Sequence, residues 1–302
     1  MTALPSGLSW LEASARQRLA ALLDPGSFAE FIGPEQRERS PHLRLFDLPE
    51  QFDDGMIVGR ATLCRTPVLV AAQEGRFMGG AFGEVHGAKL TGLLRAAALL
   101  GRDVLILFDT GGVRLQEANA GELAISEIMR AIVDLRRAGN RVIGLIGGRA
   151  GCYGGGGLIA GCCSALIVSE QGRISVSGPE VIETNKGVEE FDSRDRALVW
   201  RTMGGKHRYL IGGADGYVAD DPAAFRAATQ SALGRSPGLD LSMLHAEHQR
   251  LTRRLARFGN ARDGTDVWST LGIADPDAIP GLADDDFRHL ADACREVADD
   301  AR

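Results

Sequence analysis

The glycine-rich stretch from Val142 to Val168, VIGLIGGRAGCYGGGGLIAGCCSALIV, restricts the possible folds of this chain more than any other segment. Its pattern predicts an apolar strand at 142–146, a turn dense in glycine, a helix of small residues at 155–163 and a second apolar strand at 165–168. Each interior glycine costs a helix ~1 kcal/mol relative to alanine. The glycines of this helix therefore need an explanation other than helix stability. Either they let backbone pack closely on backbone, or they let the free N–H groups of the helix N-terminus reach a ligand.

A second glycine turn precedes this stretch. Residues 104–108 form a continuous apolar run typical of a buried strand, and Asp109-Thr110-Gly111-Gly112-Val113-Arg114 follows directly. An apolar stripe then predicts a long helix that ends at Gly139. Strand and helix therefore alternate, which favours an α/β fold with a partly parallel sheet and right-handed crossovers. In such sheets ligands bind beyond the carboxyl ends of the strands, where both glycine turns fall.

The flanking segments suggest a division of the chain into three parts. Ser9-Trp10-Leu11-Glu12 has the pattern of a capping box, and we expect the helix that follows to lie outside the main domain. Residues 56–63 and 67–73 are aliphatic and β-branched and predict a hairpin. From Leu239 onward, an apolar stripe at nearly heptad spacing predicts a helical extension that packs on the domain or on a partner. The expected parts are an N-terminal helix with an irregular segment, a main domain and a C-terminal helical extension, at residues 1–52, 53–238 and 239–302.

Composition argues against several classes of protein. The 5 cysteines include no CxxC pair, so neither a disulfide framework nor a zinc ribbon is expected, and the 6 histidines show no zinc-protease spacing. We therefore expect no metal and a cytoplasmic location. The formal net charge of -6 gives no support for binding to nucleic acid or anionic lipid. No segment approaches the ~20 apolar residues of a membrane span, so no membrane partner is expected.

Neither glycine turn carries a familiar nucleotide or hydrolase motif. The dinucleotide pattern G-x-G-x-x-G, the P-loop pattern G-x-x-x-x-G-K-[ST] and the nucleophile pattern G-x-S-x-G are all missing from them. Backbone chemistry remains: two turns that each aim an N–H at one point would form an oxyanion hole and stabilise a thioester enolate, and one such donor is typically worth roughly 10²–10³ in rate. The alternative is that the glycines serve only tight turns and a close helix contact.

Four segments then point to a family. They are FMGG at 77–80 with Gly83, FDTGGVRLQE at 108–117, AGCYGGGG at 150–157 and ISVSGPEVI at 174–182. In this order the region 56–218 resembles the carboxyltransferase branch of the crotonase (enoyl-CoA hydratase) superfamily, and in particular the β subunits of biotin-independent malonate decarboxylases. Four ordered motifs are a specific signal, whereas any one alone would be weak. The resemblance implies an α/β, crotonase-like ββα-superhelix with N- and C-terminal helical extensions.

The resemblance also implies the site residues. The first oxyanion donor would be the N–H of Val113, after Gly111 and Gly112, and the second the N–H of Gly155 or of its neighbours Gly154 and Gly156. Substrate contacts would come from five residues: Gly111, Arg114, Tyr153, Glu117 and Glu180. Of these, Glu117, Tyr153 and Glu180 are candidate proton donors. Each also has a structural interpretation: Glu117 as a carboxylate at a helix N-terminus, Tyr153 as a packing residue and Glu180 as a first-turn acid. The proton donor can equally belong to a partner.

The reaction implied by the resemblance is decarboxylation of a malonyl thioester to an acetyl thioester and CO₂. The thioester would be carried by an acyl carrier protein with a CoA-like prosthetic group, and this chain would bind no covalent cofactor and need no biotin. A γ subunit of related fold would complete the site in a heterodimer or heterotetramer. The chain lacks the four-cysteine zinc ribbon of the acetyl-CoA carboxylase β subunit, since only Cys64 precedes Cys152. Two alternatives stay open: the carboxyltransferase subunit of a biotin-dependent malonate decarboxylase or acyl-CoA carboxylase, and a noncatalytic scaffold.

Overall fold

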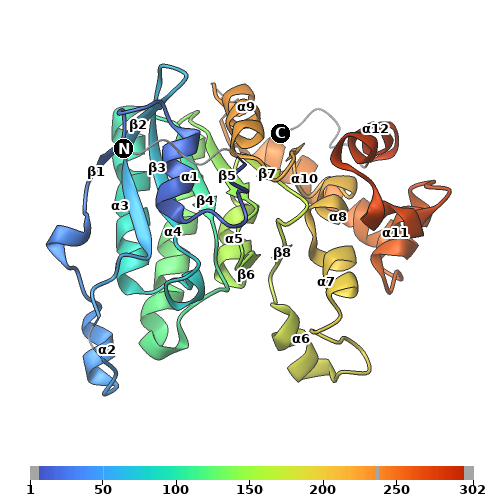
Figure 1. Ribbon diagram of the computed structural model, residues 1–302, viewed down its shortest axis with the longest axis horizontal. Helices are drawn as coiled ribbons and strands as arrows, with labels where there is room; N and C mark the ends of the chain where they lie inside the picture. The colour runs from blue at the N-terminus through green and yellow to red at the C-terminus, as the bar shows by residue number, and fades with distance from the viewer. Residues whose placement is uncertain (1–6, 50, 235–237, 296–302) are drawn as a thin grey trace.

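A seven-stranded mixed sheet forms the centre of the protein in a computed structural model that describes residues 7–49, 51–234 and 238–295 (Figure 1). The first three strands are antiparallel and the others are parallel. In spatial order the strands are β1 (Ala29–Glu30), β2 (Met56–Leu63), β3 (Thr66–Gln73), β4 (Val104–Phe108), β5 (Val142–Ile146), β7 (Ala165–Val168) and β9 (Gly216–Tyr217).

The strands form where the sequence predicts them. β2 and β3 make the expected hairpin, in which Leu63 pairs with Thr66 across a two-residue turn. The turn residues Cys64 and Arg65 both have positive φ (49° and 67°), as a hairpin turn of the primed type requires. All residues of β4, β5 and β7 are buried, which explains their continuous apolar runs: helices cover both faces of this parallel part.

Helices cover the sheet in two layers (Figure 1). α3 (Glu84–Leu100) and α4 (Asn119–Arg137) lie on one face, and α1 (Ala15–Leu22) and α9 (Pro222–Ala232) lie on the other. Alternate residues of β4 divide between the two cores: Ile106 belongs to the core under α3 and α4, and Leu107 to the core under α1 and α9. The remaining helices are α2 (Pro41–Leu45), α5 (Gly155–Gly161), α6 (Pro179–Lys186), α7 (Arg196–Met203), α8 (Gly205–Leu210), α10 (Leu241–Phe258), α11 (Gly264–Thr270) and α12 (Asp284–Cys294).

The N-terminal helix is an integral part of the sheet packing, so the expectation that it lies outside the main domain is wrong. α1 starts at Ala15 with Ser14 as N-cap, and Ser14 forms the capping box with Gln17. The expected start at Ser9 is a turn before the helix instead. Trp10 is fully buried and stacks on Phe225 of α9 with ring centroids 4.2 Å apart. Burial of this aromatic surface anchors the segment before α1 to the sheet layer.

A second, smaller sheet lies beside the carboxyl ends of the central strands. β6 (Cys152–Tyr153) and β8 (Ile174–Ser175) pair in parallel. Isolated bridges between Thr110 and Cys152 and between Phe82 and Val113 extend this layer. The two glycine turns therefore pair with each other and with two further segments, one at Phe82 and one at β8.

The C-terminal region is helical, as the sequence predicts. α11 packs on α7 and α12 on α8, and the Lys206 ammonium donates to the carbonyls of Ile279, Pro280 and Leu282. α10 exposes four leucines of its predicted stripe, Leu241, Leu244, Leu251 and Leu255. Residues 296–302 of the expected extension lie outside the described residues, and the three domain boundaries stay predictions. Within the described ranges, no helix is both long and apolar enough to cross a membrane.

Candidate active site

The two glycine turns meet at Gly112 and Gly154. Gly112 follows β4 and has φ +131°, whereas Gly154 follows β6 and has φ +57°. A Cβ added to Gly154 would lie 3.1 Å from the Cα of Gly112, which is tighter than ordinary packing allows. Glycine is therefore required at Gly154 on two grounds, the left-handed backbone and the close approach of a second backbone.

Backbone hydrogen bonds hold the turns in register. The Tyr153 N–H donates to the Thr110 carbonyl at 3.0 Å, and the Thr110 N–H donates to the Gly151 carbonyl at 2.8 Å. The Thr110 hydroxyl oxygen accepts from the Gly112 N–H at 3.1 Å. The segment 79–82 joins them: the Gly111 N–H donates to the Gly79 carbonyl and the Phe82 N–H to the Gly112 carbonyl, both at 2.8 Å. These bonds join three of the four quoted motifs, and the pairing of β8 with β6 adds the fourth.

Two of the predicted donors are next to each other and have no acceptor. Val113 packs beside Gly155, because a Cβ added to Gly155 would lie 3.0 Å from Val113 Cγ2. Gly155 is the first residue of α5, and its N-cap Gly154 has no side chain to cap the helix. In the part of the chain that the structure describes, no backbone or side-chain group accepts from the N–H of Val113, Gly155 or Gly156. These N–H groups can bind an oxyanion supplied by a substrate.

The comparison with known proteins decides the family. The carboxyl transferase domain family matches residues 12–243. This chain belongs to that family. A relative from Malonomonas rubra, malonyl-S-ACP:biotin-protein carboxyltransferase, is 40% identical over 95% of this chain and 96% of its own length. The 12S subunit of methylmalonyl-CoA carboxyltransferase from Propionibacterium freudenreichii subsp. shermanii is 30% identical over 74% of this chain and 40% of its own length.

A solved structure of this family has the same architecture. The Pseudomonas malonate decarboxylase hetero-tetramer, crystallised with malonate, contains a chain that matches with a TM-score of 0.79 and 41% identity over 87% of this chain and 97% of that one. The fold expected from the sequence is confirmed: it is the α/β, crotonase-like carboxyltransferase fold, with a mixed sheet covered by helices. The expected relation to malonate decarboxylase is confirmed at the level of the family.

Arg114 is buried inside the carboxyltransferase domain and its guanidinium is fully paired. Its Nε donates to the Ala81 carbonyl at 3.0 Å, and its Nη1 donates to Asp53 at 2.6 Å and to Glu117 at 2.9 Å. Its Nη2 lies 3.2 Å from Asp53 Oδ1 and 2.8 Å from His86 Nε2. The substrate contact predicted for Arg114 thus has no unpaired donor in this chain, and the side chain fastens the first turn to the segment before β2.

Glu117 caps a helix other than the one expected. Its side chain is fully buried, and its Oε2 accepts from the N–H of Glu84, the first residue of α3, at 2.5 Å. Its Oε1 accepts from Arg114. Both carboxylate oxygens are therefore occupied within the described residues, so the side chain stabilises the N-terminus of α3 and is not presented to a substrate.

Tyr153 is buried, whereas Glu180 is exposed to solvent. Tyr153 packs with Val199 and Met203, and burial raises the pKa of its phenol. Its hydroxyl is buried and has no hydrogen-bond partner in the part of the chain described. Glu180 is exposed in the first turn of α6. The roles predicted for Tyr153 and Glu180 stay predictions.

The buried cluster around Asp53 was not apparent from the sequence. Burial alone would raise the pKa of Asp53, but the hydrogen bonds and charges of His86 and Arg114 outweigh it and hold this pKa below its usual range. Burial, together with the Arg114 charge, lowers the pKa of His86 despite its contact with Asp53. The cluster lies behind the first turn, where it supports Arg114. Among the described residues, no group of three or more histidine, cysteine or acidic side chains is arranged to hold a metal ion.

Proposed function

We propose that this chain is the carboxyltransferase subunit of a malonate-decarboxylating system, acting on a malonyl thioester carried by an acyl carrier protein. One observation carries the proposal: the N–H groups of Val113 and Gly155 lie on adjoining turns and have no acceptor within the described part of the chain. Membership of the carboxyl transferase domain family supports it. So does the Malonomonas relative, whose name specifies a malonyl group on an acyl carrier protein.

The proposed chemistry breaks the bond between the α carbon and the free carboxyl group. The electron pair of that bond moves into the thioester and forms an enolate, whose oxygen accepts hydrogen bonds from Val113 and from Gly155 or a neighbouring glycine, Gly154 or Gly156. These donors are fixed before the substrate arrives, so no reorganisation is needed when charge develops. The carboxyl group leaves, and a proton added to the α carbon gives the acetyl thioester.

We infer that the carboxyl group passes to biotin on a separate carrier protein. The support is the Malonomonas relative, named as a biotin-protein carboxyltransferase, which matches nearly the whole chain. Biotin would supply an acceptor nitrogen, and its proton would balance the product. This proposal replaces the expectation that no biotin takes part. Direct release of CO₂ is the second candidate, because the Pseudomonas malonate decarboxylase structure is equally similar in sequence, at 41% identity.

We propose that a second subunit completes the site. The Pseudomonas relative is a hetero-tetramer, and another structure of that enzyme is an MdcD–MdcE hetero-dimer with a TM-score of 0.66 and 37% identity. Apolar side chains flank both turns and are exposed: Leu115 is 86% exposed and Leu158 is 43% exposed. The partner is also the better source of a side chain that delivers the proton to the α carbon, because Glu117 is paired and burial raises the pKa of Tyr153.

The test is reconstitution of this chain with its candidate partner subunit and a malonyl-loaded acyl carrier protein labelled at the free carboxyl. Label transferred to a biotinylated carrier, with little CO₂ released in its absence, supports the first candidate. Release of labelled CO₂ without any biotin carrier supports the second. If label stays on the substrate in both reactions although the complex assembles, both enzyme proposals fail and the noncatalytic scaffold gains support.

A further inference from the structure

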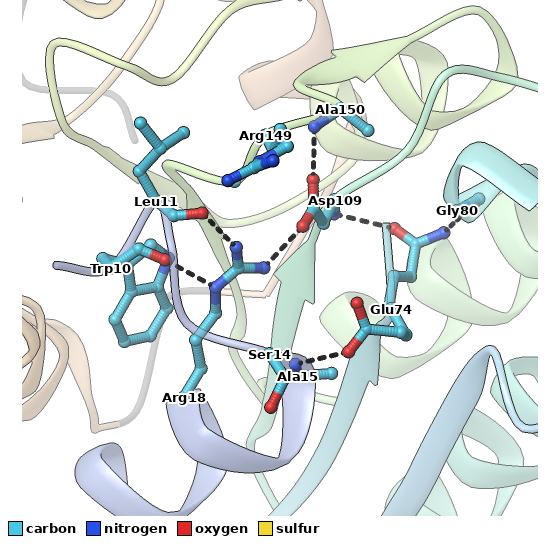
Figure 2. Close-up of polar contacts among 12 residues, drawn as sticks. Trp10, Leu11, Ser14, Ala15, Arg18, Glu74, Gly80, Asp109, Arg149 and Ala150 are labelled. Carbon is cyan, nitrogen blue, oxygen red and sulfur yellow. Dashed lines mark hydrogen bonds and ion pairs between the residues drawn. The ribbon is translucent and has the colours of Figure 1, made fainter. Parts of the chain in front are cut away.

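Asp109 connects the elements of the proposed site. It follows β4 directly and is 3% exposed. Its Oδ1 accepts from the N–H of Ala150 at 2.6 Å, so the residue that opens the first glycine turn holds the start of the second (Figure 2). A Cβ added to Gly148 would lie 2.3 Å from its carboxyl carbon, which shows how closely the second turn is packed around this carboxylate.

The third glycine segment is also attached to Asp109. The Asp109 N–H donates to the Gln73 side chain at 3.4 Å, and the Gln73 amide donates to the Gly80 carbonyl at 3.1 Å. A Cβ added to Gly80 would lie 1.7 Å from the Asp109 carbonyl oxygen, so the two backbones are in direct contact. One residue therefore touches all three segments that surround the two unpaired N–H groups.

The charge of Asp109 is balanced from outside the motifs, by Arg18 of α1. Arg18 Nη1 donates to Asp109 Oδ2 at 2.8 Å, and the two side chains are 1% and 5% exposed. The rest of the guanidinium is bound by the backbone before α1, with Nε donating to the Trp10 carbonyl at 2.8 Å and Nη2 to that of Leu11 at 3.3 Å (Figure 2). A further hydrogen bond holds α1 against the end of β3: the N–H of Ala15 donates to the carboxylate of Glu74 at 3.0 Å.

We propose that Asp109, neutralised by Arg18, is a positioning residue that sets the placement of the two oxyanion donors, so that the N-terminal helix is part of the catalytic apparatus. The inference rests on the proposed function. Two physical reasons support it. The carboxylate oxygen bonded to Ala150 fixes the second turn relative to the first, and a shift of about 1 Å in such donors can cost 10²-fold in rate. An uncompensated buried carboxylate next to the turns would also oppose a developing enolate.

The test is steady-state kinetics on the reconstituted complex with malonyl-loaded acyl carrier protein, using D109N, R18M and the double variant R18M/D109N. D109N keeps an oxygen for the Ala150 N–H but leaves the Arg18 charge unpaired. R18M keeps both Asp109 oxygens but leaves the Asp109 charge unpaired. Each single variant should lower kcat by about 10- to 100-fold with KM nearly unchanged, because the donors shift while the surfaces that bind the carrier do not. The double variant, which buries neither charge alone, should recover most of the lost kcat.

D24N is the matched control. Asp24 lies just beyond the other end of α1, where it accepts from the N–H groups of Cys64 and Arg65 and pairs with Arg226 of α9. The D24N variant should have a lower melting temperature and an unchanged kcat. If R18M does not assemble, R18K is the alternative: it keeps the charge but has one nitrogen in place of the planar guanidinium, whose Nε, Nη1 and Nη2 each bond a different group, and it should still lower kcat.

Three results overturn the inference: an unchanged kcat in assembled D109N, an unchanged kcat in assembled R18K, or single and double variants that lose stability without any change in turnover. Failure of the proposed function gives a different result, since the wild-type complex would then move no label to biotin or to CO₂.

Discussion

Gly112 and Gly154 are in contact through their backbones, such that a methyl group on Gly154 would lie 3.1 Å from the Cα of Gly112. The contact joins the end of the turn after β4 to the N-cap of α5. Val113 and Gly155 are the next residue in each turn, so the placement of the two unpaired N–H groups depends on this contact. A substitution that shifts the backbone of Gly154 should therefore also shift that of Gly112, because the two backbones are closely packed.

Gly154→Ala should therefore damage both stability and turnover. Gly154 has φ 57° and ψ -130°, a conformation that L side chains rarely adopt, and strain of this kind costs about 1–3 kcal/mol. Urea unfolding of the purified chain measures the loss. Gly161→Ala is the control from the same helix: its Cβ would meet nothing within 4 Å, and it should stabilise by up to ~1 kcal/mol without affecting turnover. Equal stability of the two variants would contradict the backbone argument.

Gly155→Pro should lower kcat strongly in a complex that still assembles. Gly155 is the first residue of α5, a position where proline is accepted, and the substitution removes the N–H. Loss of one oxyanion donor typically costs roughly 10²–10³ in kcat. Gly155→Ala is the matched control, because it keeps the N–H and shares with proline the crowding of its Cβ, which would lie 2.6 Å from Ile125 Cδ1 and Cγ1 and 3.0 Å from Val113 Cγ2. Comparable kcat values for the two variants would show that this N–H is not a donor.

Cys162→Ser and Cys163→Ser should both retain turnover. Burial raises the pKa of both thiols, so neither is a thiolate at neutral pH, and only the thiolate is an effective nucleophile. The Cys163 Sγ lies 3.6 Å from the Ile159 carbonyl, a bond that a serine hydroxyl can also make. Turnover assays and iodoacetamide labelling of the native chain provide the measurements. A folded variant without activity would mean that a thiol takes part in the chemistry.

Much of the fold was predictable because local patterns and tertiary packing agree. β2, β4, β5 and β7 occupy their predicted ranges, since apolar runs bounded by polar or glycine residues leave one arrangement that buries them. α3 ends at Leu100, and Gly101, with φ 59°, is its left-handed cap, a position where glycine is the usual residue. The predicted start of α1 at Ser9 was wrong. Ser9 and Ser14 both begin a capping pattern, and only the packing of Trp10 on Phe225 favours Ser14 as the N-cap.

The site was predictable only in part, because glycine motifs mark backbone geometry whereas buried ion pairs join distant parts of the chain. The motifs identified the turns that meet at Gly112. The same motifs suggested substrate contacts for Arg114 and Glu117, whose polar atoms the fold uses internally. Arg18 and Asp109 are 91 residues apart, and no local pattern links them. The only available signal was a charged residue at position 18, on the apolar face formed by Ala15, Leu19 and Leu22.

The stability of the chain should fall as the pH drops from 7 to 5, chiefly because of His207. This ring is 8% exposed, its Nδ1 has no partner in the described ranges, and burial lowers its pKa to about 3. An unfolded chain binds a proton at a histidine pKa of ≈ 6.5, whereas the folded chain does not. The contribution of His207 is therefore complete above pH 6.5, declines as the pH falls from 6.5 towards 3, and at pH 5 has lost about 2 kcal/mol.

Urea unfolding at pH 7, 6 and 5 measures this loss. His207→Gln should flatten the dependence, although a slope of the same sign remains because burial also lowers the pKa of His86. Asp24 and Asp53, whose pKa values lie below the usual range, lose their contribution only at lower pH, below about 4, so they do not interfere in this window. His245→Gln on the exposed face of α10 is the matched control and should leave the pH dependence unchanged. A wild-type stability that is constant from pH 7 to pH 5 would mean that the His207 ring gains a proton in the folded protein as readily as in the unfolded one.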